Sequence, residues 1–350
     1  MNISDHFIIS NLKKNPEVRL KVIHLIEESF NYTNRNQFKI DFYPLIAPSN
    51  AINNHILIEK SSGDVVAHIG VLPRFLKNKD MLIPIILMGA MVVQKNKRGQ
   101  GLFRLFLESI IKSYEPNCAL MLLWSNLTGL YNKFNFYEAG IIYQTGNNDF
   151  DHQLLSKIYD RTSFSKLNDA QFNSIKKLYD QMSDHDLSLI HRSDNDWESI
   201  KKITSTDLYL LTEDDIINGY FCVHKGHDLE NIIHEIVFIS ENKESLIETL
   251  RSYKLWLTPN LSKPSKEATP FYTAFFRPGN QNRFNDFLNN WSNHEIEVVQ
   301  IMDNLISYKH LNEPLMDTTD LFLKKIFGPD PFFKGYPYGP LIYISGLDSI

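Results

Sequence analysis

Residues 81–110 join an apolar stretch, a basic turn with two glycines and an amphipathic segment without interruption. The run Met81 to Val93 (MLIPIILMGAMVV) is apolar enough to predict a strand that is buried on both faces. From Leu102 to Ile110 the apolar residues recur at helical spacing, which predicts a helix directly after the turn. A strand, glycine turn and helix in this order constrain the local fold more than any other part of the chain.

The turn between these two elements is suited to bind an anion. Gly99 and Gly101 permit backbone conformations that other residues avoid, and they leave the main chain open to a ligand. The first N–H groups of a helix have no acceptor within the helix, and Lys97 and Arg98 add positive charge. The glycine spacing matches neither a Walker motif nor a dinucleotide fingerprint. We expect a phosphate-bearing ligand here, and the alternative is a solvated turn.

The next segments extend the pattern to a strand–helix–strand unit followed by a short helix. Cys118 to Trp124 (CALMLLW) predicts a buried strand, and Leu127 to Phe136 (LTGLYNKFNF) predicts a short helix that ends in an aromatic residue.

These two motifs resemble those of the GCN5-related N-acetyltransferase superfamily. The run Arg98 to Phe103 is similar to its acyl-CoA loop, which has Gln or Arg, then Gly three residues later, then Gly or Ala after one more residue. The run Leu130 to Phe136 resembles its later Leu-Tyr motif, in which a Gly-Phe pair follows after three residues. Phe103 replaces the usual Gly or Ala, and Asn135 replaces the usual Gly. Phe103 could narrow the pyrophosphate pocket, whereas Asn tolerates the left-handed conformation as Gly does.

The resemblance implies an α+β fold with a mixed, mostly antiparallel central sheet flanked by helices. Upstream of the loop, Glu17 to Phe30 predicts an amphipathic helix, and Asn54 to Ile58 and Val65 to Leu72 flank a Gly63-Asp64 turn as in a hairpin. The chain has 350 residues, of which 43% are hydrophobic, so two cores are expected. We predict an acetyltransferase domain at residues 1–150 and a second, related domain at 151–350.

The second half shows a similar order of elements without a comparable glycine loop. Helices are predicted at Asp169 to Met182, after a capping segment at His191 to Trp197, and at Lys243 to Tyr253. A hairpin at residues 208–223 and a strand at 232–239 lie between them. This tandem arrangement, with a degenerate second copy, resembles the enhanced-intracellular-survival group of acetyltransferases and the mycothiol synthases.

The last forty residues, about 311–350, predict an ordered tail, whose Phe327 to Pro340 part is rich in aromatic residues. In the enhanced-intracellular-survival enzymes the end of the chain enters the active site. By that resemblance, the Ile350 carboxylate or Asp348 would approach the acceptor amine, and packing of the tail across the two domains is the simpler alternative.

The resemblance also implies site residues. Tyr131 would protonate the departing thiolate, and packing with its aromatic neighbours is the alternative role. Asn126 would bind the pantetheine arm or cap the following helix. Main-chain groups of the strand end and loop would bind acyl-CoA, through Met91, Val93, Arg98, Gly99, Gln100, Gly101, Leu102 and Phe103. The general base stays open among a water chain and the side chains of His24, Glu27, Glu28, His68, His234 and Glu235.

Composition narrows the remaining classes. The formal charge of −5 disfavours a general nucleic-acid binder, and no run reaches the roughly 18 apolar residues of a membrane span. Without an apolar leader pattern, we expect a cytoplasmic protein. Cys118 and Cys222 lie in apolar strand patterns, which predicts buried free thiols. We expect no metal, because His234 and Glu235 are adjacent in a strand and point to opposite faces.

The sequence and the resemblance therefore predict an N-acetyltransferase. It would transfer an acetyl (acyl) group from acetyl-CoA (acyl-CoA), its cosubstrate, to a primary amine of a small molecule, by direct attack in a ternary complex. The alternatives are a non-catalytic acyl-CoA-binding protein and an aminoacyl-transfer enzyme on a tandem fold. The acceptor amine, the acyl chain length and the oligomeric state stay open.

Overall fold

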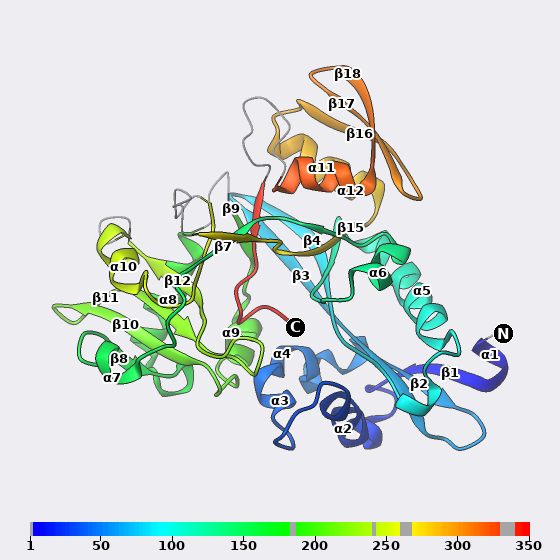
Figure 1. The fold of residues 1–350 in the computed structure, drawn as a ribbon, viewed down its shortest axis with the longest axis horizontal. Coiled ribbons are helices and arrows are strands. Elements are labelled where there is room, and N and C mark those ends of the chain that lie inside the picture. The colour runs from blue at the N-terminus through cyan, green and yellow to red at the C-terminus, as the bar shows by residue number, and fades with distance from the viewer. Residues whose placement is uncertain (1–2, 183–186, 240–242, 260–267, 330–339) are drawn as a thin grey trace.

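The computed structural model describes residues 3–182, 187–239, 243–259, 268–329 and 340–350. Within these ranges the strands form three sheets, and Figure 1 shows the first sheet on the right, the second on the left and the third at the top. The predicted α+β class with mostly antiparallel strands is confirmed. None of the described helices is long and apolar enough to cross a membrane.

The first sheet has the spatial order β1-β2-β3-β4-β5-β15-β6, with β9 and β19 attached beside β3. Its strands are β1 (Phe7–Asn11), β2 (Asn54–Glu59), β3 (Val65–Asn78), β4 (Met81–Val93), β5 (Leu120–Leu123), β6 (Tyr137–Ala139), β9 (Leu187–Ile190), β15 (Ala274–Pro278) and β19 (Leu341–Tyr343). The predicted buried strand at Met81 to Val93 is confirmed as β4, and the hairpin before it as β2 and β3.

Helices cover both faces of this sheet. Helix α2 (Arg19–Ser29) packs on β3 and β4 from one side, followed by α3 (Phe38–Asp41) and α4 (Tyr43–Ile46), and α5 (Leu102–Tyr114) packs on the other side. Helix α5 forms because its apolar residues recur at helical spacing, and its buried face carries Leu102, Phe106 and Ile110. The short elements α1 (Ile3–His6), α6 (Thr128–Tyr131) and the 3-10 turn Asn132–Phe134 complete this part.

The second sheet has the order β14-β7-β13-β12-β11-β10-β8. Its strands are β7 (Ile142–Thr145), β8 (Asp160–Thr162), β10 (Asp207–Glu213), β11 (Ile216–Val223), β12 (Ile233–Phe238), β13 (Leu255–Leu257) and β14 (Thr269–Phe271). Its helices are α7 (His152–Leu155), α8 (Asp169–Asp180), α9 (Asp194–Ile200) and α10 (Lys243–Leu250). The predicted hairpin is β10–β11, and α9 begins with a capping box made by Ser193 and Asp196. Strands β12 and β13 run parallel, as β4 and β5 do in the first sheet.

Strands cross between the two halves of the chain. Strand β15 of the second half lies between β5 and β6, where it pairs antiparallel with both. Strand β9 pairs with β3, and β19 then pairs parallel with β9. The first sheet therefore contains strands from beyond residue 150 (β9, β15 and β19), and the second sheet contains β7 from before it, so residue 150 does not divide the chain into two separate sheets.

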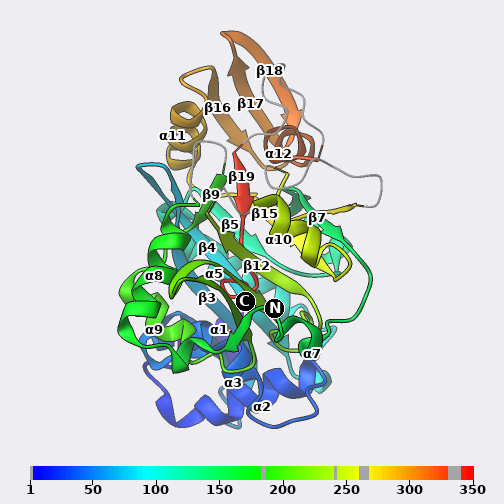
Figure 2. The ribbon, with the colours of Figure 1, turned by 90° about the vertical axis from the view of Figure 1, so that its left-hand side faces the viewer.

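A third, smaller unit spans residues 281–327, so it begins before the predicted tail at about residue 311 and extends into it. It contains α11 (Gln281–Trp291), β16 (Ile296–Met302), β17 (Leu305–His310), β18 (Glu313–Thr318) and α12 (Thr319–Phe327). Figure 2 shows this unit standing away from the two larger sheets. The aromatic run predicted at Phe327 to Pro340 falls mostly on residues 330–339, outside the described ranges. Residues 240–242, between β12 and α10, also lie outside the described ranges.

Candidate active site

The central feature of the candidate site is a gap between the parallel strands β4 and β5. The two strands pair from Ile85↔Leu120 to Met88↔Leu123, where β5 ends. Strand β4 continues to Val93 and stays paired with β3 through a bulge, in which Ala90 has a φ of 50°. Beyond Met88, one edge of β4 therefore has no strand partner among the described residues.

His68 holds this bulge in place. Its Nδ1 lies 2.8 Å from the carbonyl oxygen of Ala90, and its Nε2 lies 3.0 Å from the side-chain oxygen of Asn54. Burial lowers the pKa of His68 to about 4, although the Ala90 carbonyl acts in the opposite direction. Because both ring nitrogens have partners within the protein, His68 shapes β4 and has no nitrogen left for a substrate.

The glycine turn directly follows the free end of β4. Gly99 and Gly101 have φ values of 75° and 76°, and an added Cβ atom at either residue would meet nothing within 4 Å. Gly101 is the N-cap residue of α5, and no side chain caps this helix end. The turn is therefore an open, left-handed backbone segment in front of the positive end of a helix, and its N–H groups are suited to bind an anion.

The basic side chains of the turn are partly engaged. Arg98 donates its Nε–H to the Val93 carbonyl at 3.0 Å, and Lys97 forms an ion pair with Glu59 at 2.6 Å. Gln100 is exposed and donates its amide to Asn96 at 3.4 Å. Arg98 is exposed at the mouth of the turn, where its remaining N–H groups are available to a phosphate.

A cleft of about 1010 Å³ lies between α2 and the segment at residues 94–98. Lys21, Lys95 and Arg98 contribute positive charge to its walls, and Glu28 and Asp64 contribute negative charge. His24, one of the candidate bases, also faces this cleft. The cleft adjoins the glycine turn because Arg98 belongs to both.

Tyr131 lies on the α5 side of the sheet. Its ring meets Phe103 edge-on at 6.3 Å between centroids and lies 6.0 Å from Phe275 of β15. The side chain is 5% exposed, and burial raises its pKa to about 12, so the phenol is protonated at neutral pH. Phe103 packs against Tyr131 and Phe134, which turns its ring toward α6. Asn135 adopts a φ of 60°, so it takes the left-handed conformation expected of the usual glycine.

The other residues expected to bind acyl-CoA surround the gap and the turn. Met91 and Phe103 are half-buried, and Val93 and Leu102 are buried. Asn126 is exposed after β5, and it does not cap α6, whose N-cap residue is Leu127.

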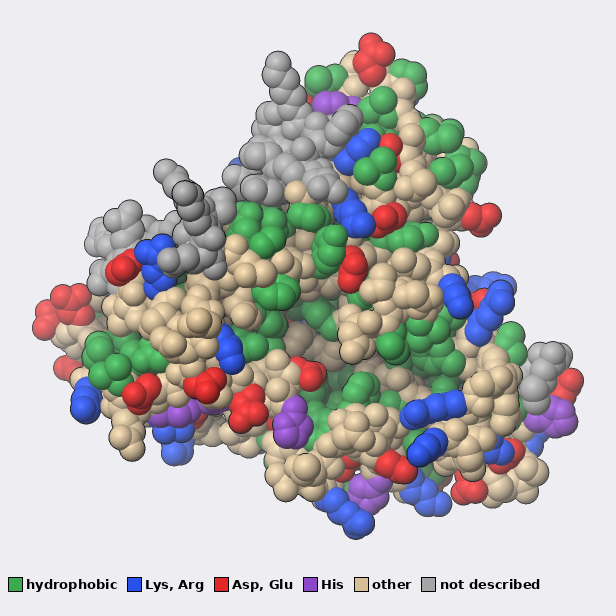
Figure 3. Space-filling view, in the orientation of Figure 1, with side chains coloured by type: hydrophobic (Ala, Val, Ile, Leu, Met, Phe, Trp, Pro, Cys, Tyr) green, Lys and Arg blue, Asp and Glu red, His purple; other side chains and the backbone are tan. Residues whose placement is uncertain are grey.

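Ile350 approaches the gap from the opposite face. A Cβ atom added to Gly89 would lie 2.7 Å from the carbonyl carbon of Ile350, so the end of the tail lies on β4 one residue beyond the last β4–β5 pair. Ile350 packs with the core on the α2 side, whereas Tyr131 belongs to the core on the α5 side. In Figure 1 the C end lies between the two halves, and Figure 3 shows a hollow there with hydrophobic side chains inside it.

Asp348, the other tail residue expected at the acceptor, is held elsewhere. Its carboxylate accepts three hydrogen bonds from buried Arg192, between 2.7 and 3.2 Å. The same guanidinium binds Glu235, and His234 donates its Nε2–H to the His224 carbonyl oxygen at 2.9 Å. Asp348, Glu235 and His234 are therefore committed to internal contacts, while Glu27 is buried and accepts from the Phe38 N–H at 3.1 Å.

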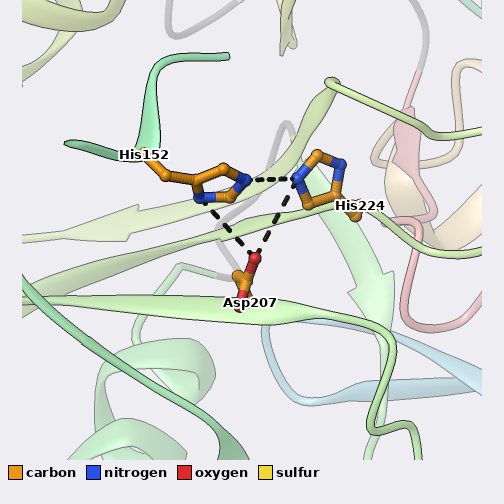
Figure 4. A group of neighbouring side chains, drawn as sticks. All are labelled: His152, Asp207 and His224. Atoms are coloured by element: carbon orange, nitrogen blue, oxygen red, sulfur yellow. Dashed lines mark hydrogen bonds and ion pairs between the residues drawn. The ribbon is translucent and has the colours of Figure 1, made fainter. Parts of the chain in front are cut away.

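One group of side chains has the composition of a metal site. His152, Asp207 and His224 lie close together in the second half, and Figure 4 shows the two rings facing each other above the carboxylate. The two Nε2 atoms are 2.9 Å apart, and the Asn231 N–H donates to Nδ1 of His224 at 2.8 Å. His224 Nδ1 is thus an acceptor, so Nε2 carries the proton and donates it to His152. A metal on that Nε2 would require a proton on Nδ1, facing the Asn231 N–H.

Both cysteines are buried free thiols, as predicted. Burial raises the pKa of Cys118 to about 12 and that of Cys222 well above its usual value. Neither thiol is suited to act as a nucleophile.

Comparison with solved structures identifies the architecture. No family model and no curated protein sequence matches the chain. A GCN5-related N-acetyltransferase from Anabaena variabilis superposes with a TM-score of 0.57 at 15% identity, covering 89% of this chain and 85% of that one. Eis1 from Mycobacterium abscessus gives 0.55 at 10% identity, covering 89% and 84%. A GCN5-related N-acetyltransferase from Kribbella flavida gives 0.55 at 16% identity, covering 79% and 73%. The chain thus has the fold of GCN5-related N-acetyltransferases, and the similarity extends over both halves.

Proposed function

We propose that the protein is an N-acyltransferase that transfers an acetyl or other acyl group from acyl-CoA to a primary amine of a small molecule. The observation that carries this proposal is the open glycine turn at Gly99 and Gly101, placed directly after the gap between β4 and β5. The turn would bind the pyrophosphate of the donor, and the unpaired edge of β4 at Met91 and Val93 would bind its pantetheine arm. The basic side chains around the turn support a ligand that carries phosphate.

In the proposed reaction the amine loses a proton, an oxyanion forms and collapses, and the departing thiolate is protonated. The amine nitrogen attacks the thioester carbonyl, the oxyanion collapses, and the carbon–sulfur bond breaks with the electron pair on sulfur. Tyr131, protonated at neutral pH, would give its proton to the departing thiolate. The amine loses a proton on the other side of the gap, where Ile350 lies.

Two tail residues were candidates to accept that proton. The position of Ile350 on Gly89 supports a role for its carboxylate. Asp348 is bound by Arg192 and is a poor candidate for this step. A water chain through the hollow between the two halves stays a further candidate, as do His24 and Glu28 of α2.

The donor site is tested by calorimetry with acetyl-CoA on the wild type and on Gly101→Glu. The added carboxylate would project into open space at the pyrophosphate position and repel it, so binding should fall at least tenfold. Gly63→Glu is a matched control, because Gly63 also has a positive φ, of 73°, and open space around it. Equal binding by all three proteins would refute the assignment of the turn.

Thiol release with a panel of amines then separates an enzyme from a binding protein. Tyr131→Phe should lower kcat roughly tenfold to a hundredfold and leave acetyl-CoA binding intact. Binding without thiol release for any amine would favour the non-catalytic acyl-CoA-binding alternative. Absence of binding to acetyl-CoA and to longer acyl donors would favour the aminoacyl-transfer alternative. We also expect the protein to act without a metal, in the cytoplasm, and without nucleic acid or membrane partners.

A further inference from the structure

Residues 341–350 return from the third unit to the centre of the molecule. Strand β19 pairs with β9, and the following residues 344–348 are almost completely buried. Gly346 packs so closely on His234 that an added Cβ atom would lie 2.5 Å from the ring. The segment 344–350, here called the tail end, is therefore packed into the interior of the molecule, and its last residue, Ile350, lies on Gly89.

Arg192 binds the tail end from the second half of the chain. Its guanidinium donates to Asp348 and to Ser345 Oγ, the latter at 3.0 Å, and it donates to both oxygens of Glu235 at 3.0 and 2.5 Å. The side chain of Arg192 has no exposed surface, and its guanidinium lies 3.8 Å from the centre of the Tyr179 ring. All these contacts fix Ser345 and Asp348 relative to β12 and α8.

Lys225 binds the remainder of the tail end. Its ammonium group donates to the carbonyl oxygens of Gly346 at 2.5 Å and Ser349 at 2.6 Å. The residue is 1% exposed, and Nζ lies 4.6 Å from the centre of the Phe42 ring, which follows α3. Lys225 thus connects the second half, the tail end and the first half at one point.

This cluster contains one buried ion network and one buried amine. Arg192 is paired with Glu235 and Asp348, whereas Lys225 donates to two carbonyl oxygens, and burial lowers its pKa to about 7. A buried charge is strongly destabilising unless it is paired, so Arg192 and the two carboxylates depend on one another. Arg192, Lys225 and Glu235 belong to the second half, outside the tail end itself.

We infer that Arg192 and Lys225 are positioning residues, which hold the tail end so that Ile350 is presented to the gap between β4 and β5 on the face opposite Tyr131. The part of this inference that concerns catalysis rests on the proposed function. It assigns a role to the second half of the chain, which provides both side chains: it places Ile350 on the acceptor side of the site.

Hydrogen exchange of the tail end tests the positioning without any assay of activity. Lys225→Met and Arg192→Met should each speed amide exchange in residues 341–350 at least tenfold. Lys225→Arg keeps a cation at the same place and should retain more protection than Lys225→Met. Lys254→Met and Arg161→Met are matched controls, because they remove ion pairs of the second half, with Asp149 and Asp207, that do not touch the tail end.

A variant on the tail end itself covers the case in which a buried substitution prevents folding. Asp348→Asn removes one carboxylate and leaves Arg192 paired with Glu235, and it should also speed exchange in residues 341–350. The inference would be overturned if Asp348→Asn, and whichever of Lys225→Met and Arg192→Met folds, protect the tail end from amide exchange as strongly as the wild type does.

Kinetics then test the consequence for the site. In Lys225→Met, kcat should fall at least tenfold, while the KM for acetyl-CoA should stay within twofold, because the glycine turn lies on the other side of the gap. If Lys225→Met only disturbed the fold, kcat and the KM for acetyl-CoA would change together or would both stay unchanged. If the wild type turns over no amine, the proposed function fails, yet the exchange result still decides whether Arg192 and Lys225 hold the tail end.

Discussion

Replacing Arg192 by Met should be among the most destabilising single changes in the second half. The guanidinium makes six hydrogen bonds, two to Glu235, three to Asp348 and one to Ser345. Glu235 is 1% exposed and Asp348 is 7% exposed, so both carboxylates would stay buried without their partner. Removing one member of a buried ion pair costs about 3–5 kcal/mol, and we expect a loss of this size at pH 8.

The pH dependence of this loss identifies its cause. In the wild type the Arg192 guanidinium holds the pKa of Glu235 below its usual value despite burial. The stability that ionised Glu235 contributes is therefore present above its pKa in the unfolded chain, and it is lost as the pH falls through its pKa in the folded protein. In the variant, burial without a partner should raise the pKa of Glu235, so stability is lost as the pH rises. The difference between the two proteins should therefore shrink by about 1–2 kcal/mol between pH 8 and pH 5, since one pKa unit corresponds to about 1.4 kcal/mol.

Urea unfolding followed by circular dichroism at pH 5 and pH 8 measures both effects. Arg161→Met is the matched control, because Arg161 also binds a carboxylate through two nitrogens, at 3.0 and 3.1 Å, but at the surface. The control should lose about 0.2–1 kcal/mol. A loss below 1 kcal/mol for Arg192→Met, or a loss that grows toward pH 5, would refute the reasoning.

Two further predictions concern the gap and the histidine pair. Gly89→Ala should displace the tail end, because the new methyl group would lie 2.7 Å from the carbonyl carbon of Ile350. The overpacking should cost about 1–3 kcal/mol and should speed amide hydrogen exchange in residues 341–350. Gly129→Ala is the control, because Gly129 has open space around it, and it should leave that exchange unchanged. Burial lowers the pKa of both His152 and His224 below their unfolded value near 6.5. The stability from the neutral pair is therefore present above that unfolded pKa and is lost as the pH falls. The urea concentration at the unfolding midpoint should be lower at pH 5 than at pH 7, and His152→Gln should make this difference smaller.

Much of the proposed donor site, which consists of β4, the glycine turn and α5, could be predicted because neighbouring residues in the sequence decide its structure. The apolar run of β4, the two glycines and the periodic face of α5 are contiguous, and each residue type favours one backbone conformation. The hairpin β10–β11 and the capped helix α9 were predictable for the same reason. The open conformations of Gly99 and Gly101 agree with this local pattern, whereas the roles of Tyr131 and the turn stay predictions until acyl-CoA binding is measured.

The proposed acceptor side, where Ile350 lies on Gly89, was decided by tertiary structure. Nothing in the apolar pattern of β15 indicates that it enters the first sheet between β5 and β6, because strand order depends on which edges are open once the other strands have paired. The partners of Arg192 and Lys225 could not be predicted from the sequence, since they lie at 345–349, more than a hundred residues away. The sequence by itself determined the strand, turn and helix that form the proposed donor site. Only the folded chain decided which residues meet across the gap, because burial and charge pairing arise when distant segments pack together.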